Sequence, residues 1–252
     1  MIPFAAVLAA LPRSRRTKPV PQRSLTGIPA SPLATAHQVL ICLCLAAFAL
    51  SSRAAETVAQ VVTLRGVASV RAPGAPDRAL QVGAPLHVGE QLITGPGAAI
   101  RLAFSDGTDV YLGAETELTI QVYGAQPDSL GFVANLAKGV FRVVTGLIAR
   151  MQPQSVTVVM PVAVIGLRGT HFGGETDGSS AVVVLLEPAE TGSGAAIDVS
   201  NPFGSVTIDE PGYGTEIPDA SSPPSPPRRM RLRAVENLIR SLSGIPRLPP
   251  RR

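Results

Sequence analysis

The sequence predicts an all-β domain, either a sandwich of short strands or a solenoid-like stack of hairpins. A basic C-terminal tail, disordered or short-helical, is expected to follow it. Gly and Pro number 24 each among 252 residues, which favours turns over long helices. Apolar and polar residues alternate in short runs, as in half-buried strands. Glycine-containing turns separate these runs at short intervals, which is typical of β-sandwiches and stacks rather than βαβ units.

Residues 1–55 have the pattern of a basic leader with a secretory signal peptide. They carry six basic residues and no acidic one, and residues 39–50 form an uncharged apolar run. Ser52 and Ala54 are small residues at the −3 and −1 positions of a cleavage site. We therefore expect a periplasmic or secreted protein cleaved near Ala54. The apolar run is shorter than the roughly 20 residues of a spanning helix, and the alternative is an uncleaved anchor.

Residues 56–220 are expected to form the β domain. Its first half predicts two short strands about a glycine turn within residues 58–70. Further strands are expected at residues 80–86, 91–94, 98–104, 109–112 and 115–122. The pair Asp106-Gly107 lies between two alternating runs, and Asp-Gly is a strong hairpin signal because glycine accepts a positive φ at little cost.

The second half of this domain continues the pattern. Strands are expected at residues 130–136, 139–144, 155–159, 181–187, 197–200, 205–208 and 215–217. Residues 137–139 and 201–204 are expected to be turns, and residues 173–180 a loop.

Residues 221–252 combine a Pro-rich linker (221–227) with a basic amphipathic tail. Residues 230–242 carry an apolar stripe at helical spacing. Three interpretations remain open: the tail lies weakly on an anionic membrane surface, docks on the protein's own acidic domain, or is disordered and folds on contact.

The charge distribution argues against nucleic acid as a partner. Residues 56–220 carry 17 acidic and 8 basic residues, a net charge of −9, whereas residues 221–252 carry a net charge of +7. Phosphate binding needs clustered Lys and Arg, which the acidic domain lacks. Both cysteines, Cys42 and Cys44, lie in the leader, so the β domain has no thiol for a disulfide, a metal site or catalysis.

Residues 161–172 contain the most distinctive candidate for binding. Arg168 lies between two glycines, and its guanidinium could hold a carboxylate or phosphate with help from Gly169 and Thr170. The alternative is a structural arginine that donates to loop carbonyls at a corner where the chain passes from one group of strands to the next. Asp106 and Gly107 form a second candidate binding loop, with a plain hairpin turn as the alternative.

The sequence gives no pattern for an enzyme, a cofactor or a metal. It contains no G-x-S-x-G nucleophile motif. His87 and His171 are not in metal-ligand spacing, so no metal site is expected. Glu115 and Glu117 share one face of a predicted strand, which indicates solvated surface more than an acid–base pair. We expect a non-enzymatic module without a cofactor, whose partner is an envelope protein or glycan of unknown identity.

Taken together, residues 57–218 resemble the FecR domain family. The segments that carry the resemblance are residues 66–70, 86–97, 102–108, 139–142, 162–172 and 182–215. The last of the short motifs reads Ala-Val-Ile-Gly-Leu-Arg-Gly-Thr-His-Phe, similar to the family's glycine- and arginine-containing signature.

The resemblance implies a β-rich periplasmic domain. In regulatory members, this domain receives a signal from an outer-membrane TonB-dependent transducer and passes it through a membrane helix to a cytoplasmic anti-sigma segment. Here residues 1–38 are Pro-rich without a helical pattern, and the apolar run is short. The chain is therefore more similar to stand-alone exported members, with an anchored anti-sigma regulator as the alternative.

Overall fold

The computed structural model describes residues 56–125, 130–168, 171–186 and 195–242. The chain divides into two units, residues 1–53 and 54–252, and all described elements belong to the second. The predicted leader and its cleavage site thus lie outside the described residues. No helix in the described ranges is long and apolar enough to cross a membrane.

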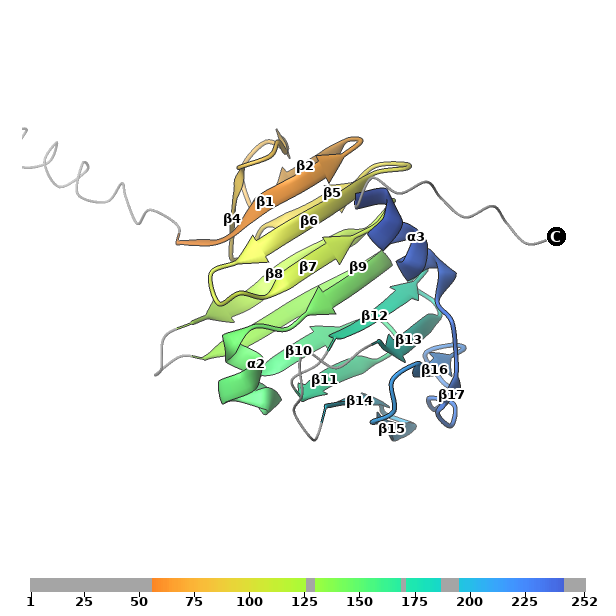
Figure 1. Cartoon of the computed structure of the whole chain (residues 1–252). Helices are drawn as coiled ribbons and strands as arrows, with labels where there is room; N and C mark the ends of the chain where they lie inside the picture. Colours follow the sequence, from red (N-terminus) through yellow and green to blue (C-terminus); the bar gives the residue numbers. More distant parts are fainter. Residues whose placement is uncertain (1–55, 126–129, 169–170, 187–194, 243–252) are drawn as a thin grey trace, which may run out of the picture. The chain divides into compact units, whose positions relative to one another are not determined.

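The strands form two β-layers, and the predicted all-β class is confirmed (Figure 1). Layer A contains, in order across the sheet, β4 (Pro85–His87), β1 (Thr57–Arg65), β6 (Ala99–Phe104), β7 (Asp109–Leu112), β9 (Gly131–Val144), β12 (His171–Thr176), β13 (Ala181–Leu185), β16 (Tyr213–Ile217) and β17 (Arg228–Arg229). Layer B contains β3 (Arg78–Ala79), β2 (Ala68–Arg71), β5 (Gln91–Thr94), β8 (Glu117–Gly124), β9, β10 (Val156–Val159), β11 (Val164–Arg168), β14 (Ala196–Asn201) and β15 (Gly204–Ile208).

Strand β9 belongs to both layers. Its first half pairs with β8 and β10 in layer B, and its second half pairs with β7 and β12 in layer A. The strand changes layer at Gly139, whose φ is +114°. A Cβ at this position would lie 2.2 Å from Thr116 Oγ1, so only glycine fits. The strands before β9 therefore form one end of both layers, and those after it form the other.

The core lies between the layers. Most strands bury every second side chain, and these side chains form one large cluster drawn from both layers. Phe132, Phe141 and Phe172 are fully buried within it, and the rings of Phe141 and Phe172 meet edge to face at 5.5 Å. Burying such a side chain contributes about 1.5–3 kcal/mol. A domain without a disulfide thus relies on this core.

Within the described residues, three helical segments accompany the strands. The α-helix α2 (Leu147–Met151) and the 3₁₀ turn η2 (Pro153–Ser155) connect β9 to β10, and α3 (Arg233–Leu242) lies near the end of the chain. α3 contacts β9, β12, β6, β7 and β1, all of them strands of layer A (Figure 1). The short-helical form predicted for the tail is confirmed.

Three of the expected elements are wrong. The strand expected at residues 80–86 is interrupted, because residues 82 and 83 form a turn and β4 begins only at Pro85. Residues 137–139 do not form a turn between two strands, because β9 runs unbroken from Gly131 to Val144. The loop expected from residue 173 begins as strand β12. There Gly173 and Gly174 conceal the apolar alternation by which a strand is recognised. The hairpin expected around residues 201–204 is confirmed, with Ile197 opposite Ile208.

The Pro-rich residues 221–227 lie against the β domain. Asn201 Nδ2 donates to the Ser222 carbonyl at 2.7 Å, and Thr215 Oγ1 donates to the Ser225 carbonyl at 2.7 Å. Pro224 is buried. The segment that composition predicts as a linker is thus held by side-chain hydrogen bonds from β14 and β16.

Candidate functional site

The Asp106-Gly107 turn forms a buried hydrogen-bond centre. Asp106 is 4% exposed, and its carboxylate accepts from the Thr108 N–H (3.0 Å) and from the Thr108 hydroxyl (2.8 Å). The Tyr123 hydroxyl donates to Oδ1 at 3.2 Å, and the Ile148 N–H points to Oδ2 at 3.4 Å. Burial raises the pKa of Tyr123, which keeps its phenol protonated and able to donate.

This centre fixes the start of α2. The Gly146 N–H donates to Thr108 Oγ1 at 2.9 Å, and the Leu147 N–H donates to the Asp106 carbonyl at 2.9 Å. Short helices have unpaired N–H groups at their first turn, and the 106–108 turn supplies acceptors for them. The carboxylate predicted as a binding group therefore has four donors within the protein, and its geometry suits a structural role.

Arg168 lies at the end of β11 on the outer face of layer B. Its guanidinium makes an ion pair with Asp198 of the neighbouring strand, with 3.1 Å between Nη2 and Oδ2. Thr207 Oγ1 donates to the other carboxylate oxygen at 2.5 Å. The Arg168 side chain is 58% exposed, so its partner here is a carboxylate rather than the loop carbonyls considered above. Gly169 and Thr170 lie outside the described residues.

The predicted corner corresponds to a change of layer. β11 belongs to layer B, and β12, which begins at His171, belongs to layer A. Arg168 and Asp106 belong to different strand pairs, and neither contributes to the two grooves described next.

The first groove lies where the C-terminal segment docks on layer A. A row of residues paired across layer A presents glycine at two points, Gly173 and Gly214. A Cβ on Gly173 would lie 3.1 Å from Val235 of α3, and one on Gly214 would lie 2.9 Å from Met230 Sδ. These glycines therefore let the tail approach the sheet. Leu232 and Val235 pack there with Val184 in a second, smaller core.

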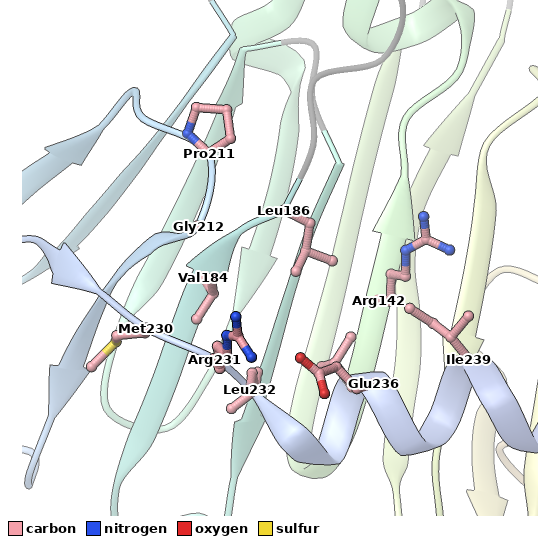
Figure 2. Close-up of a pocket in the computed structure, with 11 residues that line it drawn as sticks. Arg142, Val184, Leu186, Pro211, Gly212, Met230, Arg231, Leu232, Glu236 and Ile239 are labelled. Atoms are coloured by element: carbon pink, nitrogen blue, oxygen red, sulfur yellow. The ribbon is translucent and has the colours of Figure 1, made fainter. Parts of the chain in front are cut away.

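Beside this contact, α3 and layer A enclose a groove of about 420 Å³ (Figure 2). Most of its wall is apolar. The apolar side chains are Val184, Leu186, Pro211, Met230, Leu232, Val235 and Ile239. Arg142, Arg231 and Glu236 supply the charged groups of the lining, whose net charge is +1.

Arg142 differs from the paired arginines of the domain. It stands on β9, and its Cζ lies 5.2 Å from the centre of the Tyr111 ring. Arg101 approaches the same ring at 5.6 Å but also makes a two-point ion pair with Asp109, at 3.1 and 2.8 Å. Among the described residues no carboxylate pairs with Arg142, and its Nε is buried without a hydrogen-bond partner.

A second groove, of about 490 Å³, is lined by Lys138 and Gly139 of β9 among other residues, and it is acidic. Glu115, Glu175 and Asp177 line it together with Lys138. Burial raises the pKa of Glu175. Hydrogen bonds from the N–H groups of Ser180 and Ser179 and from their hydroxyls lower the pKa of Asp177 to about 2. Glu117 does not line it and pairs with Lys138 at 3.0 Å, so Glu115 and Glu117 do not act together.

No group of three or more His, Cys, Asp or Glu side chains with metal-binding geometry occurs within residues 56–242 as far as they are described. His87 lies beside Glu90, with 3.4 Å between Nδ1 and Oε2.

Comparison with known proteins finds a family match in the central part of the chain. Residues 90–189 match the family model described as FecR protein. Over these residues the chain is similar to FecR proteins. The match runs from Glu90 to beyond β13, so it contains the β9 strand and the strands paired with it on each side. The resemblance deduced from the short motifs is thus confirmed over residues 90–189, a shorter span than the predicted 57–218. No curated protein matches the chain.

Two kinds of solved structure are similar to parts of the chain. One, described as a cell surface anchoring domain, is 31% identical over 25% of this chain and 82% of its own, with a TM-score of 0.24. The other is a candidate anti-sigma factor from Parabacteroides distasonis ATCC 8503, present in two crystal structures. It is 15% identical, with 60% of this chain covered and a TM-score of 0.44. The chain spans 64% of that protein's length.

Sequence reasoning missed the groove and Arg142. The groove needs the tail to fold back onto β13, a contact between segments about 50 residues apart. One signal was present, because Gly173 and Gly174 interrupt a strand pattern, and consecutive glycines in a strand mark a place where another segment approaches closely.

Proposed function

We propose that this protein is a non-enzymatic, exported binding module of the bacterial cell envelope, built around its FecR domain. The family match over residues 90–189 carries the proposal. The leader pattern of residues 1–55 supports export, because a basic stretch, a short apolar run and small residues follow each other in the order of a signal peptide.

Exposed strands and turns supply the binding surface in this proposal. At one end of layer B, β15 is an edge strand of five residues without a charged side chain. The adjacent turn carries Phe203, which is 55% exposed. An edge strand offers backbone donors and acceptors to an extended partner, and an exposed aromatic ring is typical of protein and glycan contacts. The partner is an envelope protein or glycan.

A photoreactive side chain at position 203 tests the binding role. The full chain with benzoylphenylalanine in place of Phe203 would be irradiated in its own cells, with Asp77 replaced in the same way as the control. Asp77 is exposed but lies near the opposite end of layer B. We expect a discrete adduct from position 203 and none from position 77. Equal labelling from both positions, or no adduct from position 203, would refute a binding surface at this end.

The FecR match favours a second candidate, a signal-transduction regulator anchored in the inner membrane. In that case residues 1–38 remain attached on the cytoplasmic side and the β domain senses a TonB-dependent transducer. The mature N-terminus separates the two. Sequencing the N-terminus of the envelope-fraction protein should give a residue just after Ala54 if the domain is exported alone. An intact leader would overturn the exported module and support the regulator.

A further inference from the structure

The groove between α3 and layer A combines an apolar wall with the cation of Arg142, which pairs with no carboxylate in the part of the chain that the structure describes. Val184 and Leu186 form its floor on β13 and the residue that follows, and Leu232 and Ile239 of the tail form its facing wall (Figure 2). A volume of about 420 Å³ suits a small ligand, since such pockets usually measure about 300–1,000 Å³ and are mainly apolar with a few polar groups.

Arg142 supplies the polar group at one end of this wall. Five other arginines of the domain each pair with a carboxylate: Arg71, Arg78, Arg101, Arg168 and Arg228. Arg142 has the Tyr111 ring beside it and no carboxylate among the described residues. Its Nε is buried, so its two terminal nitrogens are the donors that a ligand could reach, and they suit a carboxylate held at two points.

The remaining charges allow an anion. Arg231 and Glu236 both line the groove, and in Figure 2 the Glu236 carboxylate points toward Arg231 rather than toward Arg142. The lining therefore keeps a net positive charge with Arg142 as its unbalanced member.

We propose that this groove binds an acyl chain that ends in a carboxylate. The chain lies along Val184, Leu186, Leu232 and Ile239, and the carboxylate pairs with Arg142. Burying the chain supplies the non-directional part of the affinity, and the guanidinium selects the charged end. This goes beyond the proposed envelope-binding role, which uses the far end of layer B and does not depend on the groove.

Titration calorimetry with dodecanoate, below its micelle concentration, tests the proposal on the full chain. We expect one bound dodecanoate per chain and binding weakened at least tenfold by Arg142→Met, which keeps the apolar stem and removes the charge. Arg101→Met is the matched control, because Arg101 lies over the same Tyr111 ring but is paired with Asp109 and does not line the groove. It should bind dodecanoate like the unaltered protein. The comparison also removes any contribution from the apolar leader.

Two further arms keep the test decisive if Arg142→Met does not fold. Leu186→Trp places a large ring in the groove and should abolish binding. Dodecyltrimethylammonium has the same chain with a cationic end and should bind the unaltered protein at least tenfold more weakly than dodecanoate. The proposal is overturned if dodecanoate does not saturate, if folded Arg142→Met binds as well as the unaltered protein, or if the cationic amphiphile binds equally well.

Discussion

Replacing Asp106 by alanine should reduce the stability of the whole domain. The carboxylate is the acceptor for the Thr108 N–H and the Thr108 hydroxyl, both buried. Each buried donor left without a partner costs about 1–3 kcal/mol, so the pair implies a loss of about 2–6 kcal/mol. A domain of this size is stable by about 5–15 kcal/mol, so Asp106→Ala should remain folded but with little margin.

Asp106→Asn provides a graded version of the same change. Its amide keeps one oxygen that can accept from the Thr108 N–H, so we expect about half the loss. Urea unfolding followed by circular dichroism measures both variants. The control is Asp77→Ala, which removes only an exposed ion pair with Arg71 and should cost less than about 1 kcal/mol. If Asp106→Ala unfolds at the same urea concentration as Asp77→Ala, the carboxylate does not stabilise the turn. The predicted binding role of Asp106 would then be favoured.

Four other changes test separate parts of the structure. Gly146→Ala would place a Cβ 2.4 Å from the Asp106 carbonyl and should cost about 1–3 kcal/mol in urea unfolding. Arg168→Ala removes an exposed ion pair and should cost less than about 1 kcal/mol; a loss above about 2 kcal/mol would show that the arginine holds a corner after all. Burial raises the pKa of Glu175 above its ordinary 4.5, so ionisation of this carboxyl opposes folding. The stability of the folded state therefore falls as pH rises from 4.5 through the raised pKa of Glu175. Glu175→Gln should therefore raise Tm at neutral pH but not at about pH 3.5, and a gain of equal size at both would contradict the charge argument. Val235→Asp should release α3, measured as faster tryptic cleavage of the tail while the β domain keeps its Tm within a few degrees; unchanged cleavage would mean that Val235 does not hold the helix.

The strands and turns could be deduced from the sequence where local chemistry decides the structure. The hairpin at residues 201–204 follows from an alternating pattern around a turn, and α3 follows from an apolar stripe at helical spacing. The Asp106-Gly107 turn was equally visible, and Gly107 adopts the expected positive φ of +83°. Local preferences were sufficient here because no distant segment changes them.

Elsewhere the structure depends on contacts that the sequence pattern does not reveal. β12 reads as a loop because Gly174 leaves room for the Phe141 ring, 2.6 Å from where its Cβ would lie. The five-residue α2 is too short for a periodic signal, and its start depends on Asp106, more than 40 residues earlier. The buried position of Pro224 likewise results from tertiary contacts. In the sequence Arg142 is one of several strand arginines, and only the docked tail makes it part of a groove.

The position of β9 in both layers has a consequence for how such a domain can change in length. Every strand before it extends one end of the molecule and every strand after it extends the other. Hairpins can therefore be gained or lost at either outer edge of the layers without altering the strand pairing around β9. The shared strand itself allows no such variation, since removing a residue on one side of Gly139 would put inward side chains outward in one layer only.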